Sequence, residues 1–138
     1  MRRRKMGGSM ASLWADLKGR AMGGARTRRF FLRLGAVSGA LAVAAGAYGA
    51  HGLQLSDRDK YLKKLYKTAN EYHFLHSLAL LAVPHCRKPM LVGSLLTSGM
   101  VMFCGSFYYY ALTGEPLPAK IAPTGGCLMI LGWASMAL

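Results

Sequence analysis

Two histidines three residues apart, His73 and His76, are the side chains whose types and spacing could do chemistry in this chain. On a helix they share a face, with Asn70 and Ser77 beside them. Imidazoles at this spacing can bind a metal ion or relay protons. His51, at the end of the preceding apolar segment, could come near them. These five residues are therefore the candidates for a polar site inside a membrane.

Packing is the interpretation that we favour for these side chains. The metalloprotease order His-Glu-x-x-His is absent, and Glu71 points to the other side of the helix from His73 and His76. Histidine, asparagine and serine also hydrogen-bond across helices in membranes and hold bundles together. We therefore expect helix-to-helix hydrogen bonds here, and we assign no metal ligand, no cofactor and no catalytic residue.

An enzyme is not expected. The sequence has no nucleophile-and-base constellation, no Gly-rich phosphate loop after a strand, and no pair of carboxylates placed for acid–base catalysis. The three cysteines, Cys86, Cys104 and Cys127, have no Cys-x-x-Cys spacing, so we interpret them as small buried apolar residues.

Apolar residues are gathered into blocks, which is typical of an integral membrane protein. Of 138 residues 53% are apolar, and the stretch from 90 to 112 has no charged side chain. About 20 apolar residues are enough to cross a bilayer as a helix. Four spans are predicted, at about 30–50, 68–83, 90–112 and 121–138. We therefore predict an all-α fold, a four-helix transmembrane bundle formed by residues 30–138, with the amino end, the 84–89 loop and the carboxyl end on one side.

The helix that carries the histidines begins as an amphipathic surface segment before its span. Its first turns place four lysines on one face: Lys60, Lys63, Lys64 and Lys67. Further along, Phe74 and Leu78 continue that same face, while the histidines lie on the side that was apolar before. We therefore expect Phe74 and Leu78 to contact lipid and the histidines to point into the protein. Before this helix, Gly49 and Gly52 predict a left-handed cap that ends the first span.

Small residues recur on two of the spans and predict close helix packing. In the first span they are Gly35, Gly39 and Gly46, and in the third Ser94 and Ser98. The third span ends in Phe107-Tyr108-Tyr109-Tyr110, which we interpret as an aromatic belt at the membrane interface.

Residues 1–29 form a basic arm, predicted to be disordered or to have a targeting role. Ten of the 18 Arg and Lys residues lie within the first 33 positions, against Asp16 alone. An Arg-rich, acid-poor composition is typical of a mitochondrial presequence, which makes the mitochondrial inner membrane one location to test. The other interpretation is a tail that fixes topology. Nucleic-acid binding is not expected, since the rest of the chain is so apolar.

Six segments resemble the transmembrane protein 256 family, and together they extend over residues 30–138. They are residues 31–39, 48–52, 74–81, 84–89, 103–109 and 122–126. The resemblance implies a small multi-pass membrane protein with bacterial inner-membrane relatives, and it implies no activity. The long Arg-rich extension departs from the short amino ends of that family.

Two functional hypotheses follow. The first, which we favour, is a structural or assembly module in the lipid bilayer, whose small-residue faces pack against a membrane-protein partner or a second copy. The alternative is a conduit for protons, metal ions or a small solute that uses the inward-facing His73 and His76.

Overall fold

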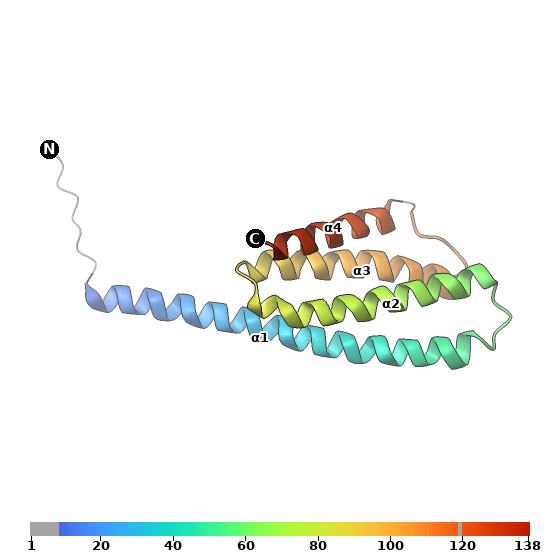
Figure 1. The fold of residues 1–138 in the computed structure, drawn as a ribbon, viewed down its shortest axis with the longest axis horizontal. Helices are drawn as coiled ribbons and strands as arrows, with labels where there is room; N and C mark the ends of the chain where they lie inside the picture. Colours follow the sequence, from blue (N-terminus) through green and yellow to red (C-terminus); the bar gives the residue numbers. More distant parts are fainter. Residues whose placement is uncertain (1–8, 119) are drawn as a thin grey trace.

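Four helices run up and down through the molecule, and each packs mainly against its neighbour in sequence. The computed structural model describes residues 9–118 and 120–138. The helices are α1 (Met10–Tyr48), α2 (Lys60–Ala82), α3 (Pro89–Thr113) and α4 (Ile121–Met136). Figure 1 shows α1 and α4 on the outer sides of the bundle, with α2 and α3 between them. The all-α prediction is confirmed for the described residues, which contain no strand.

Length and hydropathy make this a membrane bundle. The segment Met10–Leu53 and helix α3 are each long and apolar enough to cross a bilayer. α4 is apolar but has 16 residues, about 24 Å, slightly less than the ~30 Å hydrocarbon core. α2 lies antiparallel between α1 and α3 along most of its length, so it crosses with them although lysines mark its first turns. The predicted four-helix transmembrane bundle is the architecture observed.

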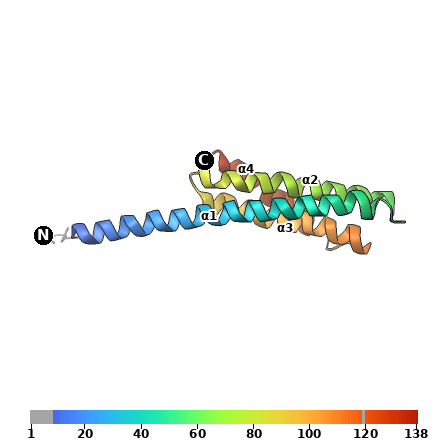
Figure 2. The ribbon, with the colours of Figure 1, turned by 90° about the horizontal axis from the view of Figure 1, so that it is seen from below.

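α1 continues through the boundary predicted between the arm and the membrane domain. It is one helix of 39 residues, begun by the Ser9 side chain, which accepts a hydrogen bond from the Ser12 amide at 3.2 Å. Figure 2 shows the first part of α1 extending straight beyond the bundle. Residues 10–29 are therefore helical and not disordered, because Ala, Leu, Met, Arg and Lys in this stretch are strong helix formers. Residues 1–8 lie outside the described residues, and the targeting role remains a prediction.

The end of α1 differs from the predicted left-handed cap. Gly49 is αR, with φ −59°, and the chain continues as a π-helix over Gly49–Leu53. The Gln54 amide donates to the Gly49 carbonyl at 3.3 Å, which is the i to i+5 bond of a π-helix. Among the described residues only Gly114 has a positive φ, +77°, and it ends α3. The glycines at 49 and 52 thus permit a wider helix turn and do not stop the helix.

α2 has the orientation that its helical wheel predicts. Phe74 and Leu78 are 42% and 48% exposed, whereas His76 is 3% and Ser77 0% exposed. α2 ends in a single 3₁₀ turn, Val83–His85, and Pro89 then begins α3 at a position where its missing amide is harmless. The prediction of a lipid-facing side and an inward polar side is confirmed by this burial pattern.

The predicted packing residues divide into two groups. A Cβ added at Gly35 would lie 3.0 Å from the Ser77 carbonyl oxygen, and one at Gly46 would lie 2.9 Å from Asn70 Oδ1. Gly39 also faces α2, at ordinary van der Waals distance from Ser77. These three glycines let α1 approach α2 closely.

Ser94 and Ser98 do not pack inside this chain. Both are exposed on α3, and each hydroxyl donates to a carbonyl of its own helix, at 2.6 and 2.7 Å. The close approach of α3 to other helices uses Gly93 and Gly99 instead, which are buried. The third span therefore has two small-residue faces, of which the glycine face is filled within the chain and the serine face is left outward.

Two of the three segments predicted to share a side, the 84–89 loop and the carboxyl end, lie together. Arg87, in the loop between α2 and α3, donates from Nη1 to the Leu138 carbonyl at 3.2 Å. The loop after α2 and the end of α4 are therefore neighbours at one end of the bundle (Figure 1).

Candidate functional site: a polar seam between α1, α2 and α3

Five polar side chains meet where α1, α2 and α3 come together, and we call them the polar seam. They are Ser38, Asn70, His73, Ser77 and Tyr108. α2 supplies three of them at i, i+3 and i+7, so they lie on one helix face. α1 can come close enough to join them because Gly35, Gly39 and Gly46 replace larger side chains along its inner face.

The bonds through the two serines have a determined direction, and they set the tautomer of a neutral His73. Ser77 Oγ donates to the His73 carbonyl at 2.7 Å, so the 2.6 Å contact between Ser38 and Ser77 has Ser38 as its donor. Ser38 Oγ then accepts from His73 Nε2 at 3.1 Å. On the other side of the ring, Nδ1 accepts from the Tyr108 hydroxyl at 3.2 Å.

The amide of Asn70 completes the seam. Its Nδ2 donates to the Tyr108 hydroxyl at 3.1 Å and to the Ala42 carbonyl of α1 at 2.7 Å. The bonds thus form a continuous chain from Asn70 to the backbone carbonyl of His73. Within this chain a ring proton of His73 lies on Nε2.

His76 belongs to a different contact. Its Nδ1 donates to the Tyr72 carbonyl at 2.8 Å, and its Nε2 accepts from the indole Nε1 of Trp133, on α4, at 3.1 Å. Because an indole can only donate, the ring proton of His76 lies on Nδ1. Three residues turn a helix by about 300°, so the two rings point about 60° apart, which is enough for them to enter different helix interfaces.

The five candidates are therefore brought together only in part. Asn70, His73 and Ser77 share the polar seam, His76 faces α4, and His51 is exposed in the π-helix. His51 lies 13 residues beyond Ser38 along α1, a distance of about 20 Å. Among the described residues no three His, Cys, Asp or Glu side chains gather in the way that a metal ion requires.

Three partners of the histidines were missed in the sequence. Ser38 lies between Gly35 and Gly39 on the packing face of α1, and from that position it could have been predicted to face α2. Tyr108 was assigned to an aromatic belt, but its hydroxyl points into the bundle. Trp133 gave no signal, because nothing in the sequence shows which helix α4 contacts.

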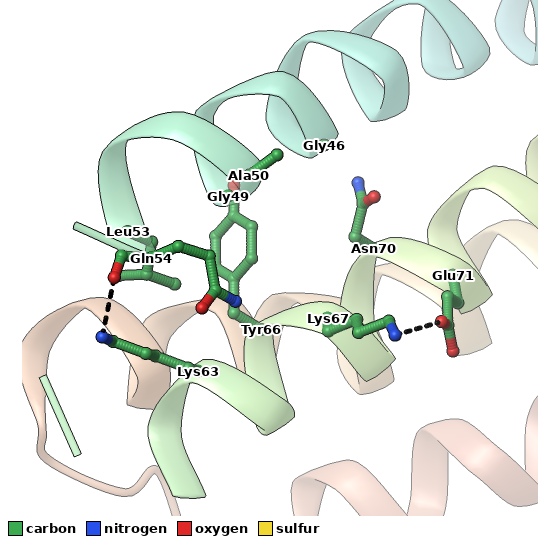
Figure 3. Close-up of a pocket in the computed structure, with 10 residues that line it drawn as sticks. All are labelled: Gly46, Gly49, Ala50, Leu53, Gln54, Lys63, Tyr66, Lys67, Asn70 and Glu71. Atoms are coloured by element: carbon green, nitrogen blue, oxygen red, sulfur yellow. Dashed lines mark hydrogen bonds and ion pairs between the residues drawn. The ribbon is translucent and has the colours of Figure 1, made fainter. Parts of the chain in front are cut away.

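A groove opens beside the seam, between the end of α1 and the start of α2, and we call it the α1–α2 groove (Figure 3). Its volume is about 440 Å³. It is lined from α1 and the π-helix by Gly46, Gly49, Ala50, Leu53 and Gln54, and from α2 by Lys63, Tyr66, Lys67, Asn70 and Glu71. Among these lining residues, Tyr66 of α2 donates from its hydroxyl to the Ala45 carbonyl of α1 at 2.6 Å. Of the polar seam, only Asn70 reaches this groove.

Comparison with known proteins gives the same class of protein. The family described as "Protein of unknown function (DUF423)" matches residues 45–126, which include all of α2 and all of α3. A UPF0382 membrane protein of Staphylococcus epidermidis is 36% identical over 115 residues, 80% of this chain and 93% of its own. The chain belongs to the DUF423 family of UPF0382 membrane proteins.

This family reaches beyond one group of bacteria. UPF0382 membrane protein YwdK of Bacillus subtilis is 36% identical over 76% of this chain and 90% of its own. A UPF0382 membrane protein of the yeast Schizosaccharomyces pombe is 40% identical over 73% of this chain and 92% of its own. No solved structure matches the chain. The protein is thus an integral membrane protein of a family whose biochemical activity is not established, and neither the relatives nor the hydrogen bonds of the histidines support the conduit alternative.

Proposed function

We propose that this DUF423 protein is a non-enzymatic assembly module, which packs in the bilayer against a membrane-protein partner or a second copy. The outward serine face of α3 is the observation that carries the proposal. Ser94 and Ser98 are spaced as i and i+4, which is the small-x-x-x-small spacing that lets membrane helices approach closely. Both serines are exposed on the surface of α3.

The serines line a groove between α1 and α3, which supports the proposal. The groove has a volume of about 610 Å³ and is otherwise mostly apolar, with Phe30, Leu34 and Met90 in its walls and Arg26 at its edge. Since both serine hydroxyls bond within α3, an incoming helix would find no unpaired hydroxyl at these two positions. Such a surface suits helix packing, in which van der Waals contact is the main attraction.

The experiment compares two double substitutions. Ser94→Leu/Ser98→Leu fills the groove face, and Ala40→Leu/Ala44→Leu adds the same bulk at exposed i and i+4 positions of α1. We expect the native chain to form a complex in mild detergent and in liposomes, measured by light scattering and by energy transfer between labelled copies. The Ser94→Leu/Ser98→Leu variant should form no complex, whereas the Ala40→Leu/Ala44→Leu variant should still form it. A native chain that is a strict monomer in both media and crosslinks to no membrane protein would refute the proposal.

Two narrower assignments are also proposed. The sequence resemblance over residues 30–138 supports the transmembrane protein 256 group within the family. The Arg-rich composition of residues 1–29 supports a mitochondrial inner-membrane location, and nucleic acid is not proposed as a partner. Subcellular fractionation, with amino-terminal sequencing of the mature protein, tests the location and the fate of the arm together.

A further inference from the structure

The α1–α2 groove changes character along its length. At the end near the π-helix it is bordered by Lys63 and Lys67. At the other end it continues into a second hollow of about 250 Å³, which shares Gly46, Asn70 and Glu71 with it. The two hollows therefore form one continuous path between α1 and α2.

The far part of this path is apolar. Its walls are Ala42 and Val43 of α1 and Phe74 of α2, and Val43 and Phe74 are 60% and 42% exposed. From Lys63 to Phe74 the path follows α2 for 11 residues, about 16 Å. A cationic end and an apolar end at this separation match an amphiphile with a negative head.

Both lysines keep donors for an anion. The Lys63 ammonium donates to the Gln54 carbonyl at 3.0 Å, and Lys67 Nζ lies 3.9 Å from Glu71 Oε1 (Figure 3). An ammonium has three donors, so each lysine can also bind a phosphate oxygen. Glu71 offsets one of the two charges, and the groove keeps a net positive charge, to which the nearby Lys60 and Lys64 add.

Glycines shape the cavity between these ends. Gly46 and Gly49 lack the side chains that would meet Asn70 and Tyr66, so these two α2 side chains seat directly against α1. The π-helix widens the last turn of α1 at the same place. On the α1 side the groove is lined by Gly46, Gly49 and Ala50, whose small size leaves room for a head group, while Leu53 and Gln54 close the end at the π-helix.

We propose that the α1–α2 groove binds one anionic phospholipid, with its phosphate between Lys63 and Lys67 and an acyl chain along Val43 and Phe74. The lysine face meets the membrane surface at the point where α2 enters the bilayer, so a phospholipid reaches the groove from its own leaflet. This binding is independent of the serine face of α3, since the two surfaces share no residue.

The test measures lipid binding to the purified full chain by native mass spectrometry. Phosphatidylglycerol and phosphatidylcholine of identical acyl chains are titrated separately. Each lysine near a membrane surface contributes about fivefold to the binding of an anionic lipid, so Lys63→Gln/Lys67→Gln should weaken phosphatidylglycerol binding about 25-fold. The matched pair Lys60→Gln/Lys64→Gln removes the same charge outside the groove and should weaken it less than fivefold.

A second comparison fills the groove without changing charge. Ala50→Phe places a ring beside the lysines and should lower phosphatidylglycerol binding at least tenfold. Ala47→Phe, exposed at the end of α1 and outside the groove, should leave phosphatidylglycerol binding unchanged. Equal losses from the two lysine pairs, unaltered binding by Ala50→Phe, or equally tight binding of phosphatidylcholine would each overturn the proposal.

Discussion

The contact between α3 and α4 gives the sharpest prediction, because backbone meets backbone there. A Cβ added at Gly99 would lie 2.7 Å from the Gly125 carbonyl oxygen and 2.8 Å from the Met129 amide nitrogen. A Cβ added at Gly125 would lie 2.6 Å from the Phe103 amide nitrogen. Backbone atoms of packed helices cannot turn aside, so either methyl group must push the two helices apart.

The size of the effect follows from these distances. An ordinary Cβ contact begins at 3.4 Å, so Gly99→Ala requires the helices to separate by about 0.7 Å. A gap of that size loses between a quarter and a half of the dispersion attraction between α3 and α4. Overpacking of this kind destabilises by about 1–3 kcal/mol, and the better helix propensity of Ala returns up to about 1 kcal/mol. We expect a net loss of about 1–2 kcal/mol in the free energy of unfolding.

Gly126, next to Gly125 on α4, provides the matched control. A Cβ there would lie 3.8 Å from the Phe103 ring, which is ordinary contact, so Gly126→Ala should be neutral or slightly stabilising. Reversible unfolding in mixed micelles, followed by circular dichroism, measures the free energy of unfolding of Gly99→Ala, Gly125→Ala and Gly126→Ala. The double variant Gly99→Ala/Gly125→Ala should lose less than the sum of the single losses, because one separation accommodates both methyl groups. Equal stabilities of Gly99→Ala and Gly126→Ala would refute the reasoning.

Three further predictions concern the polar contacts. Asn70→Ala removes the bonds to Tyr108 and to the backbone of α1, and should lower the free energy of unfolding by about 1 kcal/mol in the same micelle assay. Trp133→Phe leaves the Nε2 of His76 without its donor and should lower the free energy of unfolding by about 0.5–2 kcal/mol. Trp14→Phe, at an exposed position, should leave that free energy unchanged. Nitrogen-15 NMR at neutral pH should show His73 as the Nε2–H tautomer and His76 as the Nδ1–H tautomer, and the same tautomer for both rings would contradict the hydrogen-bond directions.

The orientation of α2 could be predicted because it depends only on the helical period. The lysine face, Phe74 and Leu78 lie along one side in any helix of this sequence, so the histidines must face inward once that side meets lipid. The number of long helices and the bounds of α3 and α4 followed from uncharged length, whereas α1 begins 20 residues before its predicted span because the charged arm is helical too. These features need no knowledge of which helix lies beside which.

The partners of the polar residues could not be predicted, since they depend on helix neighbours. Ser38 and Tyr108 are 35 residues from His73 in opposite directions along the chain, and only the packed bundle brings them to its ring. Whether Ser94 and Ser98 pack inside the chain could not be predicted either. A small-residue pattern predicts a packing face, but it does not say whether the chain itself fills that face.

The uninterrupted helix of α1 has a mechanical consequence. Residues 10–29 of α1, about 30 Å of helix, extend beyond the end of the bundle where α2 ends and α3 begins, and they form one stiff rod with no break. A molecule attached near Trp14 would be held at a set height above the membrane and at a set angle around the helix axis. Inserting a single residue between Gly19 and Gly24 would turn that attachment by about 100° while moving it only about 1.5 Å.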